Sequence, residues 1–339
     1  MNNIQLFQSR LKDDSCGAII YSPHNRYYFT GFPSTDGILF ITRTSAVFLI
    51  DSRYIEAAKK EADGCEVVLL TNTKQQLGEL SAKLGVKKVG IEAYDMPVST
   101  MERFRRIMPD IKFDISDGIS ETIAHLRMIK SDSEIVSMKK AQEITDKAFE
   151  HILEFVKPGV AERDLALEIE YFMKKNGAQG PSFDLITISG ENTSRPHGVP
   201  GDRKIKNGDF VTMDTGALVD GYCSDMTRTV AVGKIDAEQK KVYETVLKAQ
   251  REAIEALEPG KKCSEIDKIS RDIIDCAGYK GCFGHGLGHS VGLQIHEEPR
   301  LSPNCDIELE PGMTMTVEPG IYLEGRFGVR IEDMILITN

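Results

Sequence analysis

The sequence GDFVTMDTG, residues 208–216, decides how this chain folds, because its plan recurs in GMTMTVEPG, residues 312–320. In each stretch one glycine stands six residues before an acid, Asp214 or Glu318, and another glycine follows the acid two residues later. The apolar and β-branched residues between the first glycine and the acid favour a β-strand. The two stretches therefore predict two related hairpins, each of which carries a carboxylate.

Each hairpin brings a second acid: Asp225 follows Asp214, and Glu332 follows Glu318. Four clustered carboxylates repel one another strongly, because like charges in a low-dielectric site cannot all stay ionised. Divalent cations remove this repulsion, and holding metal is the best-known use of such a cluster. We therefore predict a metal site where the two hairpins meet.

The duplication extends upstream of the hairpins. Lys157-Pro158-Gly159 recurs as Glu258-Pro259-Gly260, a shift of 101 positions. Four further pairs match at the same shift: Leu165 and Ile266, Phe172 and Ile273, Met173 and Ile274, Gly177 and Gly278. Each copy has the pattern of a long helix, a Pro-Gly turn, a second helix that ends at a glycine, and strands. This pattern predicts an α+β domain with an internal pseudo-two-fold repeat, in which helices pack on a curved antiparallel sheet.

The segment before the repeat has a different pattern. Strands are predicted at 16–21, 37–50, 65–70 and 87–91, with a hairpin turn at 42–45, and helices near 53–62, 74–84 and 98–107. This alternation indicates a separate, smaller α/β domain. Ser131-Asp132-Ser133-Glu134 then has the pattern of a capping box that begins a long helix. We expect an N-terminal α/β domain over residues 1–125 and a larger domain over residues 126–339.

Composition excludes several classes of protein. The net charge of −10 argues against a nucleic-acid surface. No apolar run reaches the ~18 residues of a membrane span, and residues 1–14 are polar, have the pattern of a helix and lack an apolar signal segment. The seven cysteines are an odd number without a C-x-x-C pair, which predicts reduced thiols and a cytoplasmic location.

Histidines form the second strong signal, in GHGLGHSVGLQIHE, residues 284–297. His285, His289 and His296 fall within twelve residues, and imidazole both binds transition metals and moves protons. The glycines in this segment exclude a regular helix and let the backbone approach a ligand. The segment contains neither a zincin motif nor a phosphate-binding loop. His197, in Arg195-Pro196-His197-Gly198, is a separate candidate.

Taken together, these residues resemble the pita-bread metallopeptidases (family M24), in particular the branch of Xaa-Pro dipeptidases (prolidases) and aminopeptidase P. Residues 27–32 (YYFTGF) and 49–54 (LIDSRY) are similar to the creatinase-like N-terminal domain of that branch. The catalytic half resembles the family through the histidine segment and through MDTG at 213–216, SDMTRT at 224–229, TVEPG at 316–320 and VRIED at 329–333. Family members usually continue for a short stretch beyond the position of Asn339.

The resemblance implies a site with two divalent metal ions, manganese first, with cobalt, zinc or iron as alternatives. The implied ligands are Asp214, Asp225, His289, Glu318 and Glu332. In the family, the positions of Asp225 and Glu332 bridge the two metals. Implied catalytic residues are His197, His296, Glu318 and Arg330, and implied substrate contacts are His197, His285, His296 and Arg300. Arg300 could instead form a surface salt bridge with Glu297 or Glu298.

The implied activity is hydrolysis of the Xaa-Pro bond in dipeptides or short peptides with a free N-terminus, by attack of a hydroxide that bridges the two metals. Xaa-Pro dipeptidase is the first choice, and aminopeptidase P, which acts on longer Xaa-Pro peptides, is the alternative. A non-catalytic pita-bread binding module is a more distant one, because such proteins typically lose ligands and none is lost here. The expected partners are a small peptide substrate and a second copy of the chain.

Overall fold

The structure is a computed structural model that describes residues 2–13 and 15–339. The chain divides into two compact units, residues 1–127 and 128–339. Over the described residues, no helix combines the length and the apolar character that crossing a membrane requires.

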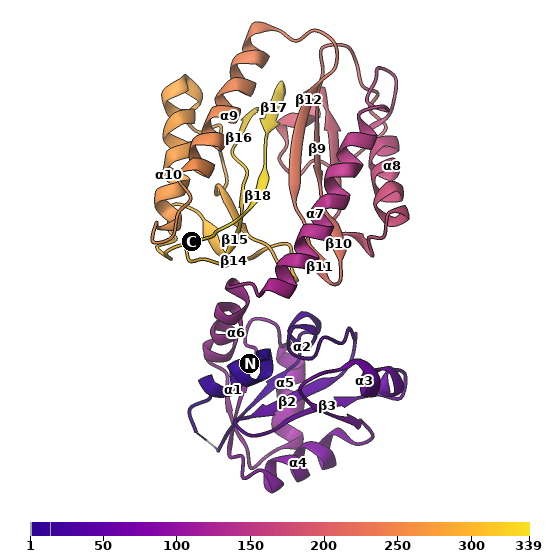
Figure 1. Ribbon diagram of the computed structural model, residues 1–339, viewed down its shortest axis with the longest axis vertical. Coiled ribbons are helices and arrows are strands. Elements are labelled where there is room, and N and C mark those ends of the chain that lie inside the picture. Colours follow the sequence, from indigo (N-terminus) through magenta and orange to yellow (C-terminus); the bar gives the residue numbers. More distant parts are fainter. Residues whose placement is uncertain (1, 14) are drawn as a thin grey trace. The chain divides into compact units, whose positions relative to one another are not determined.

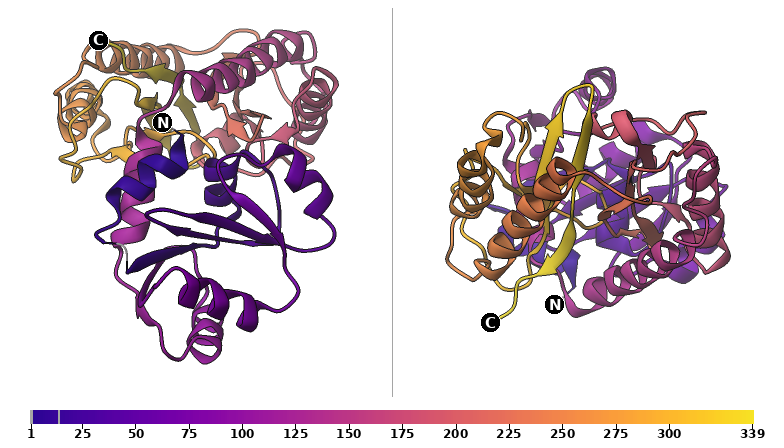
Figure 2. Two further views of the ribbon diagram at one scale, coloured as in Figure 1. Left: turned by 60° about the horizontal axis from the view of Figure 1, so that its bottom comes forward. Right: turned by 90° about the horizontal axis from the view of Figure 1, so that it is seen from above.

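The first unit is an α/β domain built on one six-stranded sheet (Figures 1 and 2). Its strands are β1 (Cys16–Ile20), β2 (Ile38–Thr42), β3 (Ala46–Ile50), β4 (Glu66–Leu69), β5 (Lys88–Ile91) and β6 (Lys112–Asp114). Their order is β4-β3-β2-β1-β5-β6, and the pairs β3–β4, β1–β5 and β5–β6 are parallel. Every residue of β2 and β3 is buried, as expected for central strands covered on both faces.

The helices of this unit are α1 (Asn3–Arg10), α2 (Pro23–Thr30), α3 (Ile55–Glu61), α4 (Thr73–Lys83), α5 (Val98–Ile107) and α6 (Gly118–Met128). The predicted strands and helices of this segment are confirmed to within about two residues, a usual accuracy for boundaries, and the amide of Thr42 donates to the carbonyl of Ser45 at the predicted hairpin turn, at 2.8 Å. Helices α2 and α6 and strand β6 were not predicted from the sequence.

The second unit contains four long helices, α7 (Asp132–Ile152), α8 (Glu162–Lys175), α9 (Ala237–Glu255) and α10 (Cys263–Ile274). In Figures 1 and 2, α7 and α8 lie on one flank of the strands, and α9 and α10 lie on the other. The predicted capping box begins α7: the amide of Ser131 donates to Glu134 Oε2 at 2.8 Å.

All strand pairs of this unit are antiparallel. The first half contributes β7 (Gly180–Pro181), β8 (Ile186–Ser189), the 3₁₀ helix η1 (Gly190–Ser194), β9 (Phe210–Thr215), β10 (Ala217–Val219), β11 (Tyr222–Cys223) and β12 (Met226–Ala231). The second half contributes β13 (Gly288–Ser290), β14 (Glu297–Leu301), β15 (Thr314–Val317), β16 (Gly320–Leu323), β17 (Phe327–Arg330) and β18 (Asp333–Leu336).

The predicted repeat is present in the backbone. The Pro-Gly turns end in Gly159 and Gly260, which have φ values of 93° and 87°, a region that favours glycine. Their amides donate to equivalent carbonyls, those of Ile205 at 2.9 Å and Leu309 at 2.8 Å. The halves differ after the second helix, because α10 continues into a π turn (Asp275–Tyr279).

Each half of the second unit has its own core. Val211 and Met213 of β9 pack with residues of α7 and α8, whereas Met315 and Val317 of β15 pack with residues of α9 and α10. Successive side chains of a strand point to opposite faces. The threonines and acids that alternate with these apolar residues therefore lie on the face away from the helices.

Candidate metal centre and active site

One cavity of about 430 Å³ in the second unit is lined by all ten residues that the sequence analysis singled out. They are His197, Asp214, Asp225, His285, His289, His296, Arg300, Glu318, Arg330 and Glu332. The ten residues span 136 positions of the chain, from 197 to 332. The two halves of the repeat therefore bring their polar residues to a single site.

Strand register explains how the acids meet. Asp214 lies on β9 opposite Thr227 of β12, and Asp225 immediately precedes β12. In the second half, Glu318 follows β15 directly, and Glu332 immediately precedes β18, whose Asp333 pairs with Val317. Each acid therefore stands at or near the end of a paired strand, which is a rigid place for a functional group.

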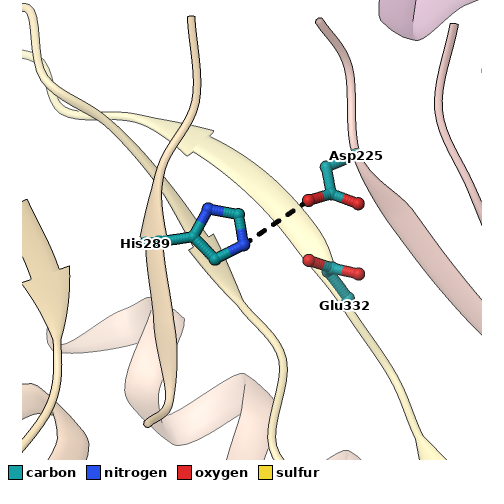
Figure 3. A group of neighbouring side chains, drawn as sticks. All are labelled: Asp225, His289 and Glu332. Atoms are coloured by element: carbon teal, nitrogen blue, oxygen red, sulfur yellow. Dashed lines mark ion pairs between the residues drawn. The ribbon is translucent and has the colours of Figure 1, made fainter. Parts of the chain in front are cut away.

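Three of the predicted ligands form a group that could hold a metal ion. Asp225, His289 and Glu332 are buried, and each offers one ligand atom within 4.8 Å of the other two. Figure 3 shows the three side chains directed toward one another. His289 Nε2 lies 3.6 Å from Asp225 Oδ2 and 3.4 Å from Glu318 Oε1. The fourth acid, Asp214, pairs with Arg330.

His289 is oriented by its neighbours. Its Nδ1 lies 3.1 Å from the carbonyl oxygen of Ser290, a contact that orients the ring so that Nε2 faces the acids, where a metal ligand would stand. The amide of His289 donates to Thr316 Oγ1 at 3.0 Å. Gly288 permits this approach of β13 to β15, because a Cβ there would lie 2.0 Å from the carbonyl oxygen of Thr316.

The acids of the cavity disfavour one another's ionisation, and the protein compensates this only in part. Burial raises the pKa of Asp225 well above its ordinary value, and the charges of Glu332 and Asp214 raise it further. The pKa of Glu332 is likewise raised by burial and then by Glu318 and Asp214. Burial also raises the pKa of Asp214, although Arg330 opposes this. A bound divalent cation would stabilise the ionised form of these neighbouring carboxylates.

Glu318 differs from these three acids. Burial acts to raise its pKa, but the adjacent imidazole of His289 outweighs burial and the pKa lies below its ordinary value. Two buried carboxylate oxygens, Asp214 Oδ1 and Glu332 Oε1, have no hydrogen-bond partner. Buried acceptors are nearly always satisfied, so these two free oxygens fit a site built for divalent cations.

Arg330 connects the acids to the rest of the cavity wall. It is only 4% exposed, and its Nη2 donates to Asp214 Oδ2 at 2.7 Å. Its Nη1 donates to the hydroxyl of Tyr322 at 3.0 Å and to the carbonyl of Pro196 at 3.3 Å. Burial lowers the pKa of Arg330, but Tyr322 and Asp214 outweigh this effect and raise the pKa well above its usual value.

The remaining histidines lie on the cavity wall in different settings. His285 Nε2 lies 3.0 Å from the Tyr322 hydroxyl, and the His296 ring lies 4.5 Å from the His289 ring. Burial lowers the pKa of His285, and burial and then the charge of His289 lower that of His296. Both rings are therefore neutral near pH 7 and able to donate a hydrogen bond. His197 and His296 are both exposed, whereas His285 is partly buried.

Arg300 has both a place on the cavity wall and a surface ion pair with a glutamate. It lines the cavity, and its Nε lies 3.6 Å from Glu298 Oε1, with about half of each side chain exposed. Glu297 does not pair with Arg300: its carboxylate lies 3.3 Å from Lys130 Nζ in a buried ion pair.

Some residues of the site were not predicted. Thr227 donates to Glu332 Oε2 at 2.7 Å, and Tyr322 joins Arg330 to His285. Thr227 stands two residues after Asp225. Because residues two apart in a strand point to the same face, this spacing could have placed Thr227 beside the acids. The sequence carried no comparable signal for the other wall residues, Phe183, Asp184, Ile186, Ile295 and Ser302.

Comparison with known proteins agrees with this geometry. The model of metallopeptidase family M24 matches residues 136–339, and that of the creatinase/prolidase N-terminal domain matches residues 4–129. The chain therefore belongs to metallopeptidase family M24. Membership implies divalent metal ions, which the cluster of acids and His289 fits.

Three relatives cover nearly the whole chain. The chain is 40% identical to the Xaa-Pro dipeptidase of Pyrococcus horikoshii, over 97% of this chain and 92% of the relative. An Xaa-Pro dipeptidase structure from Bacillus anthracis superposes with a TM-score of 0.94 at 41% identity, covering 99% of this chain and 94% of that one. An X-Pro aminopeptidase structure from Thermotoga maritima gives a TM-score of 0.91 at 34% identity, covering 98% and 95%. These matches confirm the predicted fold class.

Proposed function

We propose that this protein hydrolyses the Xaa-Pro bond of dipeptides with a free N-terminus, as an Xaa-Pro dipeptidase. The observation that carries the proposal is that the ten residues line one cavity, where buried acids surround His289 and two of their oxygens lack partners. The similarity to proteins named Xaa-Pro dipeptidase, at about 40% identity over the full chain, supports the choice of substrate.

The metal ligands in this proposal are Asp214, Asp225, His289, Glu318 and Glu332. Two divalent cations held by them would lower the pKa of a water molecule and polarise the scissile carbonyl. Four carboxylates and one imidazole suit manganese, and also cobalt, zinc or iron. We propose manganese as the physiological ion.

The chain's own side chains then position the substrate and move its protons. Glu318 would carry a proton from the attacking water toward the leaving proline nitrogen, since its lowered pKa keeps it ionised. His296, which is neutral near pH 7, would donate a hydrogen bond to the oxyanion. Arg330 would hold Asp214 in place through its 2.7 Å contact. His197 and His285 would contact the peptide from the cavity wall.

The chemistry of proline explains why a dedicated peptidase is needed for this bond. An Xaa-Pro bond has no N–H, so recognition by extended-strand hydrogen bonding fails there. A dipeptide also ends in a carboxylate next to the proline ring, and the guanidinium of Arg300 on the cavity wall suits that group.

Aminopeptidase P activity is the alternative, because the X-Pro aminopeptidase structure of Thermotoga maritima matches nearly the whole chain. The two activities share their chemistry and differ only in what binds beyond proline. The experiment is hydrolysis of matched Xaa-Pro and Xaa-Pro-Xaa peptides by protein stripped with a chelator and reloaded with Mn²⁺, Co²⁺ or Zn²⁺. About two bound metal equivalents and faster dipeptide cleavage support the proposal. Metal-independent cleavage, or no cleavage at all, would overturn it.

Arg300→Ala separates the two activities within one protein. Loss of a charge-assisted hydrogen bond should lower kcat/KM for the dipeptide by about 10- to 100-fold and leave the tripeptide within about threefold. Arg326→Ala is the matched control, because Arg326 is 53% exposed, Arg300 is 52% exposed, and each pairs with a glutamate. Equal losses on both peptides would contradict the assignment of Arg300.

We further propose that the enzyme is a homodimer that acts in the cytoplasm, and that its catalytic domain begins near residue 126. The seven cysteines, all of them free thiols, support a reducing location. Analytical ultracentrifugation of the metal-loaded protein tests the dimer.

A further inference from the structure

Glu162, the first residue of α8, is a buried acid that the proposed chemistry does not use. It is 1% exposed, and its carboxylate accepts hydrogen bonds from several groups of one loop. The amide and the hydroxyl of Ser189 donate to Glu162 Oε1 at 2.7 and 2.8 Å. Asn192 Nδ2 donates to the same oxygen at 3.0 Å, and the amide of Gly201 donates to Oε2 at 3.2 Å.

These contacts hold both ends of the segment that carries His197. Ser189 is the last residue of β8, and Gly201 lies four residues after His197. Between the ends, Arg330 donates to the carbonyl of Pro196 at 3.3 Å. Gly198 packs so closely on Ile188 that a Cβ would lie 2.9 Å from its Cδ1. His197 therefore stands on a loop that is anchored before it, after it and at both ends.

Arg203 is linked to Glu162 through the hydroxyl of Ser189. Its Nη1 donates to the Ser189 hydroxyl at 2.7 Å, and that hydroxyl in turn donates to Glu162. Arg203 also pairs with Asp209 at 2.6 Å. The carboxylate and the guanidinium are thus linked through one serine, which makes the loop geometry sensitive to the loss of any member.

The second half of the repeat has a comparable arrangement, in which a buried acid of a helix accepts a hydrogen bond from a loop. Asp267 of α10 is also 1% exposed, and it accepts a hydrogen bond from the amide of Leu287 at 3.0 Å. Its ion-pair partner Arg271 donates to the carbonyls of Phe283 and His285 at 3.0 and 2.9 Å. In each half, a buried acid on the second helix holds the loop that carries a cavity histidine proposed not to bind metal.

We propose that Glu162 is a positioning residue for His197, so that its carboxylate fixes the place from which His197 contacts the peptide. This inference rests on the proposed function, because it assigns His197 a contact with the substrate. It also makes a structural claim that needs no substrate: the carboxylate of Glu162 determines the order of residues 189–201.

A double-mutant cycle tests the link between the two residues. Glu162→Gln keeps the shape of the side chain but directs an N–H₂ group at hydrogen-bond donors. It should lower kcat/KM for an Xaa-Pro dipeptide by about 10- to 100-fold, as small displacements of positioning groups do. In a His197→Ala background the same change should cost less than about threefold, because the displaced group is already gone. In a His285→Ala background it should keep its full effect.

Hydrogen exchange gives a readout that does not depend on activity. In Glu162→Gln, the amides of Ser189 and Gly201 should exchange faster while that of Leu287 stays unchanged. Asp267→Asn is the mirror control, with faster exchange at Leu287 alone. Bound metal, measured by elemental analysis, should equal that of the wild type.

Two results would overturn the inference: an equal loss from Glu162→Gln with and without His197, or unchanged exchange at residues 189–201. If Glu162→Gln does not fold, Asn192→Ala replaces it, because it removes a donor without leaving a buried charge unpaired. A wild-type protein that cleaves no Xaa-Pro peptide would refute the proposed function, and the exchange measurements would still decide the claim about the loop.

Discussion

Thr227 donates its hydroxyl hydrogen to Glu332 Oε2 at 2.7 Å, across 105 positions of the chain. The same hydroxyl oxygen accepts a hydrogen bond from Arg330 Nε at 3.0 Å. With Oε2 engaged in this way, Glu332 Oε1 is left without a partner on the cavity side. A threonine of the first half therefore fixes the orientation of a candidate ligand of the second half.

Thr227→Val should accordingly weaken metal binding without unfolding the protein. Loss of a partner that orients a ligand typically lowers metal affinity by about 10- to 100-fold. Competition with a chromogenic chelator during reloading of stripped protein measures this. Thr229→Val is the control, because Thr229 is buried on the same strand but bonds to Thr212 and the Arg330 backbone. Equal affinities in the wild type and Thr227→Val would show that Glu332 needs no such support.

Asp225→Asn should stabilise the metal-free protein. Burial, then Glu332 and Asp214, raise the pKa of Asp225 well above its ordinary value, so the folded state binds protons more tightly than the unfolded state. Metal-free stability should therefore fall as pH rises above the ordinary carboxyl range, and recover as pH falls. The amide, which cannot ionise, should therefore raise the free energy of unfolding of the metal-free protein at pH 8.

Urea unfolding of the two metal-free proteins at pH 8 and pH 6 measures the effect. The gain from Asp225→Asn should shrink at pH 6, and added Mn²⁺ should stabilise the wild type more than the variant. A metal-free variant less stable than the wild type at pH 8 would show that the four carboxylates do not repel one another as the structure indicates.

Local patterns gave the strands and the location of the acids. The apolar runs at 38–42 and 46–50 form β2 and β3, because each is bounded by turn residues and buried on both faces. The acids converge because they occupy matching places in a repeated hairpin. In contrast, β6 (Lys112–Asp114) has only three residues and no apolar alternation, so nothing local marked it as a strand.

Long-range polar contacts could not be predicted in this way. Arg330 donates a hydrogen bond to Asp214 across 116 positions of the chain. Glu162 accepts hydrogen bonds from residues that lie between 27 and 39 positions away. Glu162 looks like an ordinary helix-starting acid in the sequence, and only its burial distinguishes it. The identity of the five metal ligands stays a prediction, although the fold places all five on one cavity.

Thiol reactivity should differ sharply between Cys263 and Cys276. Cys263 is fully buried, and burial, with Cys305 beside it, raises its pKa to about 12. Cys276 is exposed. Only the thiolate reacts with alkylating agents, so iodoacetamide at pH 8 should label Cys276 within minutes and spare Cys263 until the protein unfolds. Peptide mass spectrometry follows both sites, and equally rapid labelling of Cys263 would show that the start of α10 opens readily.

The turn that carries His296 depends on a buried ion pair. Lys130 Nζ lies 3.3 Å from Glu297 Oε2, and the two side chains are 1% and 6% exposed. Lys130 also donates to Ser290 Oγ at 3.0 Å. The carboxylate of Glu297 accepts from the amide of Gln294 at 3.1 Å. The pair thereby ties the residue after His289 to the residue after His296.

Lys130→Met should cost about 3–5 kcal/mol of unfolding free energy, because it removes the cation from a buried ion pair. Adding Glu297→Gln should recover most of that loss, while peptide hydrolysis stays impaired because the His296 turn has lost its tie to Ser290. Lys140→Met is the matched control: its partner Asp220 lies 3.8 Å away and both are more than half exposed, so it should cost less than about 1 kcal/mol. If Lys130→Met were as mild as Lys140→Met in urea unfolding, the ion pair between Lys130 and Glu297 would not be what stabilises this turn.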